Sequence, residues 1–111
     1  MNILVIGAGG MAGHVISLYL SEKGYNVTSL TRKKIDFLPN NILGDASDSI
    51  FLGKLLKKHK YEIVINCVGI LNQFADDNKS EAILLNSYLP HYVASILKDT
   101  RTKLIHMSTD C

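Results

Sequence analysis

The stretch "GAGGMAGH" at residues 7–14 carries the residue types and spacing that point most directly to chemistry. It fits two dinucleotide-binding patterns, G-x-G-x-x-G/A through Gly7, Gly9 and Ala12, or G-x-x-G-x-x-G through Gly7, Gly10 and Gly13. Both patterns use the same physics, because glycine permits a tight turn and a close approach of the backbone to a pyrophosphate. The amides that open the following helix then offer hydrogen-bond donors to phosphate oxygens. A phosphate site is therefore predicted, and a tight turn that binds nothing is the alternative.

The basic run Thr31-Arg32-Lys33-Lys34 bears on which nicotinamide dinucleotide would bind. An NAD site usually offers Asp or Glu about 20 residues after the glycine motif, to bind the ribose 2′-hydroxyl. No acidic residue occurs between Lys23 and Ile35. The Arg32 guanidinium could instead bind a 2′-phosphate, which favours NADP(H) and leaves NAD(H) as the second choice. A solvated basic loop that binds nothing is the alternative.

Polar or small residues also follow the later apolar runs. The Asp45 carboxylate could accept a hydrogen bond from an adenine amino group, or could instead form a turn or cap with Ser47 and Asp48. In "NCVG" at 66–69, Asn66 could tie a strand end to its neighbours, and Gly69 would let the backbone pass close to a ribose.

Two hydroxyl-bearing residues, Ser108 and Thr109, follow the last apolar run of the chain. Hydroxyls at such a place can hydrogen-bond a substrate carbonyl oxygen and a proton donor. A Ser/Thr pair after a strand also occurs without any catalytic role, and its position at a strand end is what favours function here.

The elements that must position these residues alternate between short apolar runs and helix-like segments. Strands are expected at 3–6, 26–30, 42–43, 62–66 and 103–107, and helices at 12–23, 48–59 and 79–98, with a kink or a new helix at Pro90. The first helix is expected to bury Ala12, Val15, Ile16, Tyr19 and Leu20. This order predicts an α/β fold with a doubly wound, Rossmann-like parallel sheet of strand order 3-2-1-4-5. Ligands of such sheets bind beyond the carboxyl ends of the strands.

Composition limits the function classes. The 111 residues form at most one domain, with 47% hydrophobic and 20% charged residues. A net charge of +2 is too small to argue for nucleic acid. Cys67 and Cys111 are too few for a disulfide framework and, without flanking ligands, do not suit a metal site. Glycines interrupt the apolar stretch 3–20, so neither a signal peptide nor a membrane span is expected, and we expect a soluble, cytoplasmic chain.

Taken together, the motifs "GAGGMAG", Gly44-Asp45, "NCVG", "LNSYLPHYVA" and "LIHMSTD" resemble the extended short-chain dehydrogenase/reductases. Within them, the dTDP-4-dehydrorhamnose reductase group of sugar-nucleotide reductases is the nearest. The resemblance implies a cofactor-binding set that comprises Gly7, Gly9, Gly10, Met11, Ala12, Gly13, Arg32, Asp45, Ala46, Cys67, Val68, Gly69 and Ser108. Thr109 matches the catalytic Ser/Thr, which helps to hold the substrate ketone. Cys67-Val68 is bulkier than the usual pattern, and the segment 73–80 also departs from it.

The chemistry of such enzymes also needs a Tyr-x-x-x-Lys pair, in which Tyr donates a proton and Lys lowers its pKa. Only Tyr19 has a lysine four residues later, Lys23, and this pair belongs to the first helix, which is the wrong element. We therefore expect residues 1–111 to be an incomplete NAD(P)-binding domain, without the catalytic pair and the substrate domain, and inactive alone.

The expected parent enzyme reduces the keto group of a nucleotide-activated deoxysugar for polysaccharide synthesis, with a homodimer as one option for its assembly. Two other functions stay open. One is a non-catalytic dinucleotide sensor or regulatory subunit. The other is an epimerase or dehydratase of the same superfamily, which would retain tightly bound NAD.

Overall fold

Five parallel strands and three helices make up the described part of the chain, residues 1–68 and 89–107 of the computed structural model. In chain order they are β1 (Asn2–Ile6), α1 (Met11–Glu22), β2 (Asn26–Thr31), β3 (Asn41–Leu43), α2 (Ser49–Lys58), β4 (Ile63–Asn66), α5 (Leu89–Leu97) and β5 (Lys103–His106). The strands pair in the order β3-β2-β1-β4-β5. The predicted doubly wound Rossmann-like topology is therefore confirmed.

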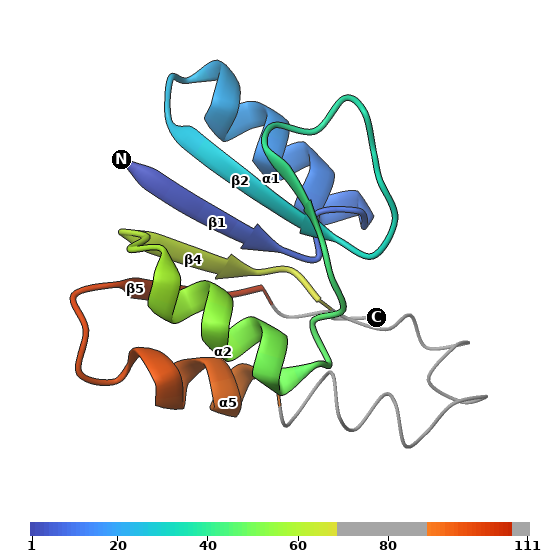
Figure 1. Ribbon diagram of the computed structural model, residues 1–111. Helices are drawn as coiled ribbons and strands as arrows, with labels where there is room; N and C mark the ends of the chain where they lie inside the picture. The colour runs from blue at the N-terminus through green and yellow to red at the C-terminus, as the bar shows by residue number, and fades with distance from the viewer. Residues whose placement is uncertain (69–88, 108–111) are drawn as a thin grey trace.

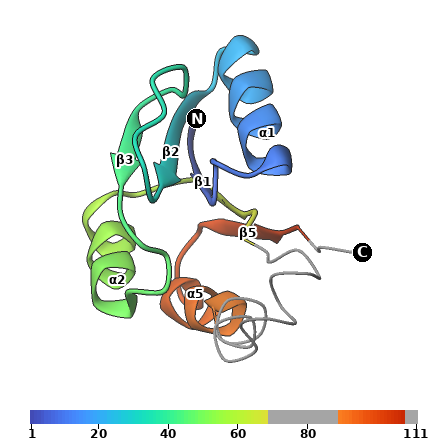
Figure 2. The same ribbon diagram turned by 90° about the vertical axis from the view of Figure 1, so that its right-hand side faces the viewer.

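Helices cover both faces of the sheet, with α1 on one side and α2 and α5 on the other (Figures 1 and 2). The central strands β1 and β4 contain continuous apolar runs, 3–6 and 63–65, because both of their faces are covered. On one face Leu4, Ile6 and Val64 pack against α2 and α5, and on the other Ile3 and Val5 pack under α1. The sheet thus provides a rigid base, with the carboxyl ends of all five strands at one edge.

The α2 helix lies within the predicted range 48–59 and buries one of its faces. Leu52, Leu55 and Leu56 are buried in the core. Asp48 is the N-cap, and its side chain accepts a hydrogen bond from the Phe51 amide at 3.1 Å. This cap fixes the connection from β3, and with it the position of Asp45.

The predicted buried face of α1 is wrong in part. Ala12, Val15 and Tyr19 are exposed, the last two at 54% and 57%, whereas Gly13 and Ser17 are buried. At Gly13 the helix lies so close to the glycine-rich turn that no larger side chain fits between them. Ser17 adapts to this site because its hydroxyl donates to the Gly13 carbonyl at 2.8 Å. The exposed Tyr19 ring instead has the Lys23 ammonium 5.4 Å from its centroid.

The remaining predicted elements lie where expected or outside the described residues. Pro90 stands in the first turn of α5, where proline is tolerated, and residues 79–88 of the predicted helix are not described. No helix among the described residues is long and apolar enough to cross a membrane.

Candidate functional site

The turn between β1 and α1 is wedged between the ends of β2 and β4. The amides of Gly7 and Ala8 both donate to the Leu30 carbonyl, each at 3.1 Å. Gly7 has φ +78°, and a Cβ atom there would lie 2.9 Å from both the amide nitrogen and Cγ2 of Val68. Both the backbone conformation and the space therefore require glycine at position 7.

Gly13 decides between the two glycine patterns. A Cβ atom at this position would lie 2.3 Å from the Gly7 carbonyl oxygen and 2.8 Å from Ala8 Cα. At Gly10 the nearest atom would be 3.8 Å away, and Ala12 of the competing pattern is exposed. The packing thus favours G-x-x-G-x-x-G, in which Gly13 brings the start of α1 against the turn.

The first turn of α1 offers backbone amides to an anion. Its N-cap, Gly10, has extended backbone (φ −77°, ψ 172°) and gives no side-chain cap, and no acidic residue stands in the first turn. The first amides of a helix have no acceptor within it and carry the positive end of the helix dipole. Met11 is 82% exposed, so this end is open to solvent. A pyrophosphate suits such a place.

Arg32 is presented by a loop that other side chains hold in place. The Thr31 hydroxyl donates to the Lys33 carbonyl at 2.7 Å and accepts from the Asn41 side-chain Nδ2 at 2.8 Å. The Asn41 side-chain oxygen also accepts from the Ile35 amide at 2.8 Å. The three basic residues of the run are therefore exposed on a hydrogen-bonded loop at the carboxyl edge. Sequence reasoning missed Asn41, whose signal is its place at the first position of β3.

Asp45 lies at the same edge and forms the turn that was one of its two predicted roles. One carboxylate oxygen accepts from the Ser47 amide at 2.9 Å and from the Ser47 hydroxyl at 2.7 Å. These hydrogen bonds, and the nearby positive charge of Arg32, lower the pKa of the Asp45 carboxyl. Asp45 is therefore ionised and exposed near Arg32, and Ala46 follows it, partly buried against the core.

Asn66 ties the end of β4 to its neighbours, as predicted. Its side chain is fully buried. The side-chain amide nitrogen lies 3.2 Å from His106 Nδ1 on β5, and the side-chain oxygen accepts from the Val68 amide at 3.0 Å. These contacts fix Cys67 and Val68 beside the glycine-rich turn, where the Val68 amide faces Gly7.

Cys67 is a half-buried free thiol, and burial raises its pKa to about 11. The thiol is therefore neutral at physiological pH, which does not suit a nucleophile.

We expect iodoacetamide to alkylate Cys67 at pH 8 at least about 100-fold more slowly than an exposed thiol of ordinary pKa, since the thiolate is the reacting form. The rate should rise with pH until about pH 11. Peptide-resolved mass spectrometry measures it, with the urea-unfolded chain as the control. Equal labelling of folded and unfolded chain at pH 8 would contradict this description.

The remaining predicted site residues, Gly69, Ser108 and Thr109, lie outside the described residues. Among the residues that are described, no group of three His, Cys, Asp or Glu side chains could hold a metal ion. The structure thus brings together the glycine-rich turn, Arg32, Asp45 and Val68 at one edge of the sheet.

Comparison with protein families decides the membership of this chain. The model described as "NAD dependent epimerase/dehydratase family" matches residues 3–111. The chain belongs to this family. The resemblance to extended short-chain dehydrogenase/reductases that the motifs indicated is thereby confirmed.

Individual relatives agree with this placement. The chain is 27% identical over 109 residues to a dTDP-4-keto-6-deoxy-D-glucose reductase of Streptomyces niveus, covering 96% of this chain and 34% of that protein. It is 28% identical over 110 residues to a dTDP-4-dehydrorhamnose reductase of Mycolicibacterium smegmatis, covering 98% of this chain and 30% of that protein. The chain thus spans about a third of the length of these curated relatives.

A solved structure supports the fold. The L-threonine dehydrogenase from Clostridium difficile matches with a TM-score of 0.86 and 22% identity. The match covers 97% of this chain and 36% of the dehydrogenase.

Proposed function

We propose that this chain is the NADP(H)-binding part of a reductase that acts on the keto group of a nucleotide-activated deoxysugar. The observation that carries the proposal is the packing of Gly13 against Gly7, which sets the open, uncapped start of α1 at the end of β1. A Cβ atom at either position would meet backbone atoms. The residues present therefore fit a dinucleotide whose pyrophosphate lies against this turn.

The other residues at this edge would hold the two ends of the dinucleotide. Gly9, Gly10, Met11 and Ala12 would share the pyrophosphate with Gly7 and Gly13. The Arg32 guanidinium would bind the 2′-phosphate, which gives the preference for NADP(H). Asp45 and Ala46 would lie beside the adenine, and the ionised Asp45 can accept from its amino group.

On the other side of the turn, Cys67, Val68, Gly69 and Ser108 would line the ribose and nicotinamide. The buried Asn66 would keep this strand end in place. When bound, NADPH supplies a hydride for the reduction of a carbonyl carbon. Thr109 would hydrogen-bond the substrate ketone and orient it.

The substrate class rests on the relatives, whose names describe reductases of dTDP-linked keto-deoxysugars. The parent enzyme would then contribute to polysaccharide precursor synthesis. The chain offers one Tyr-x-x-x-Lys pair, Tyr19 and Lys23, and this pair lies on the exposed side of α1. We therefore expect residues 1–111 to bind NADPH without oxidising it in the presence of a dTDP-4-keto-6-deoxysugar.

An epimerase or dehydratase is the second candidate, because the family description names both activities. Such enzymes must keep their nicotinamide cofactor through each turnover, whereas a reductase must exchange it. We expect the purified chain, after exhaustive dialysis, to contain less than about one dinucleotide per ten chains by mass spectrometry of the denatured protein, since affinities of exchangeable cofactors are moderate. Near-stoichiometric NAD after dialysis would contradict the reductase and support the second candidate.

A further inference from the structure

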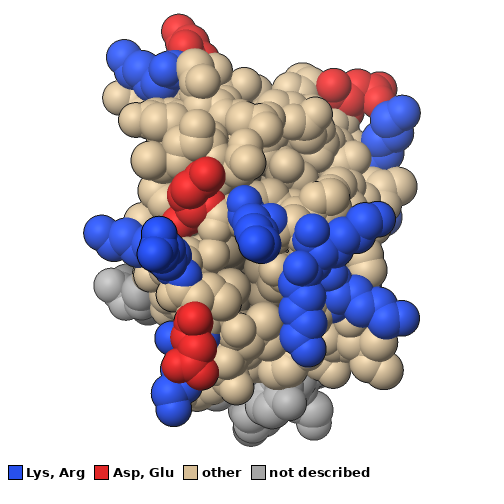
Figure 3. All heavy atoms as spheres, turned by 60° about the vertical axis from the view of Figure 1, so that its left-hand side comes forward, with Lys and Arg blue, Asp and Glu red and all other residues tan. Residues whose placement is uncertain are grey.

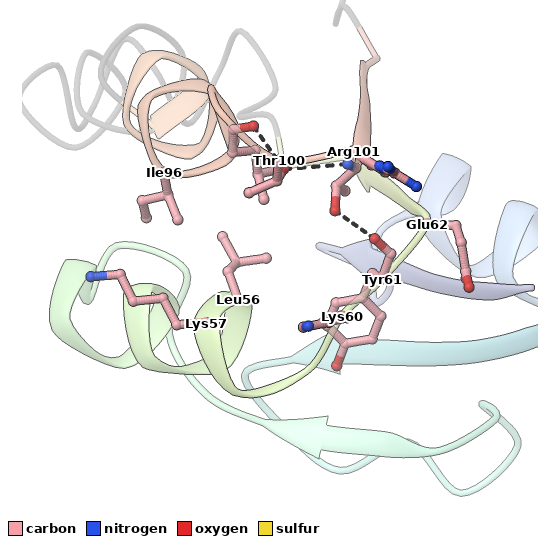
Figure 4. Close-up of a pocket in the computed structure, with 10 residues that line it drawn as sticks. Leu56, Lys57, Lys60, Tyr61, Glu62, Ile96, Thr100 and Arg101 are labelled. Atoms are coloured by element: carbon pink, nitrogen blue, oxygen red, sulfur yellow. Dashed lines mark hydrogen bonds between the residues drawn. The ribbon is translucent and has the colours of Figure 1, made fainter.

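A pocket of about 530 Å³ opens at the amino-terminal edge of the sheet, opposite the glycine-rich turn (Figure 4). It lies between the carboxyl ends of α2 and α5 and the segments that lead into β4 and β5. Its volume is in the range that small-molecule sites occupy. The proposed dinucleotide site does not use any of its residues.

Apolar side chains form the floor of this pocket. Leu56, Tyr61 and Leu97 are buried members of the core, and Ile96 is partly buried against them. In Figure 4, Leu56 from α2 and Ile96 from α5 point toward one another across the pocket. An aromatic or branched aliphatic group would be removed from water on contact with this floor.

Internal hydrogen bonds already occupy the polar groups on one side of the pocket. The Leu97 carbonyl accepts from the Thr100 amide at 3.0 Å and from its hydroxyl at 2.7 Å. The Thr102 hydroxyl donates to the Tyr61 carbonyl at 2.6 Å. Neither hydroxyl therefore has a hydrogen left for a ligand, whereas the charged side chains of the rim can donate to one.

The rim is positively charged. Lys57, Lys60 and Arg101 are exposed there, with Lys57 and Arg101 on opposite sides of the pocket in Figure 4. The one acidic residue of the lining, Glu62, accepts a hydrogen bond from the Asn2 amide and points away from the others. On the face that contains this edge, Figure 3 shows several Lys and Arg side chains, with acidic side chains beside part of them.

The negative carboxyl ends of the two helices do not neutralise the positive charge of the rim. The carboxyl ends of α2 and α5 carry about half a negative charge each. Together they amount to roughly one elementary charge, whereas the lining supplies three cations and one carboxylate. A net positive potential therefore remains over an apolar floor.

We propose that this pocket binds a small organic anion, an aryl or alkyl phosphate or carboxylate. Its apolar body lies on Leu56, Tyr61 and Ile96, and its anionic group is held by the cations of the rim. The proposal is independent of the dinucleotide site, because the two sites lie at opposite edges of the sheet and share no residue.

Titration of the ¹⁵N-labelled chain with 2-naphthyl phosphate tests the proposal, with 2-naphthoate, neutral 2-naphthol and inorganic phosphate as comparisons. We expect saturable shifts in the amides of Tyr61 and of residues 100–102 with both naphthyl anions, and binding at least about threefold weaker with naphthol, since each exposed ion pair contributes up to about 1 kcal/mol. Whichever of the two naphthyl anions binds more tightly shows whether the pocket prefers a phosphate or a carboxylate group. The affinity should be unchanged with NADPH present.

Matched charge variants complete the test. The double variant Lys60→Gln/Arg101→Gln should weaken the binding of naphthyl phosphate about threefold to tenfold and leave the binding of naphthol unchanged. The double variant Lys54→Gln/Lys98→Gln removes the same charge from exposed residues that do not line the pocket. It should change neither the affinity for naphthyl phosphate nor that for naphthol. All four positions are exposed, so the fold should be kept, as the spectra will show. Absence of shifts at this edge, equal binding of naphthol, or equal losses in both double variants would each overturn the proposal.

Discussion

Gly13→Ala should destabilise the chain by about 1–3 kcal/mol and weaken NADPH binding by at least about tenfold, because overpacking at a close backbone contact forces the elements apart. Helix propensity alone predicts the opposite sign, since alanine is favoured over glycine inside a helix by about 1 kcal/mol. The contact decides, because the added Cβ would lie 2.3 Å from the Gly7 carbonyl oxygen. Urea unfolding followed by circular dichroism measures the stability, and calorimetry measures the affinity.

The matched control is Gly9→Ala in the same turn. There the nearest atom to the added Cβ is the end of the Ile35 side chain at 3.4 Å, an ordinary contact with a flexible group. The free energy of unfolding should change by less than about 0.5 kcal/mol, as for a surface substitution. If Gly13→Ala were as stable as Gly9→Ala, α1 would not be packed against the turn as described.

Arg32→Ala should weaken NADPH binding by about 10–100-fold and leave NADH binding within about twofold, because a charge-assisted contact to a phosphate contributes about 1.5–3 kcal/mol. Only NADPH carries the 2′-phosphate, so the ratio of the two affinities isolates that contact from any general change in the site. Calorimetric titration of each nucleotide into both proteins gives the ratio.

Lys34→Ala provides the control for the Arg32 experiment. Lys34 belongs to the same basic run, and its ammonium lies 3.9 Å from the Asp36 carboxylate on the surface. Its removal should change neither affinity by more than about twofold, since such exposed pairs contribute little. If Arg32→Ala lost affinity for NADPH and NADH equally, Arg32 would maintain the structure of the loop rather than bind the 2′-phosphate.

The fold was predictable from sequence because short runs with apolar residues alternate with helix-like segments along the chain. The runs at β1 and β4 are buried on both faces, so their patterns were unambiguous. Parallel pairing followed from the need of such strands for crossover connections, and the strand order was taken from the usual Rossmann-like arrangement. The role of Asn66 followed from its place at a strand end.

Local packing was the part that periodicity could not give. The apolar pattern placed Tyr19 on the buried side of α1. Gly13 instead packs closely against the glycine-rich turn, so the side of the helix with Gly13 and Ser17 is the buried one. The choice between the two glycine patterns needed the same contact. For Asp45, the sequence allowed either an adenine partner or a turn, and only the folded structure shows the two hydrogen bonds with Ser47.

Titration of NADPH into the folded chain, followed by calorimetry and by the amide spectra of Met11 to Gly13, is the most direct test of the proposed site. We predict saturable binding of one NADPH per chain, weaker binding of NADH, and shifts of these amides, which the uncapped start of α1 leaves open to an anion. No heat with either nucleotide, together with unmoved amides in a chain that circular dichroism shows to be folded, would contradict a dinucleotide site at this turn.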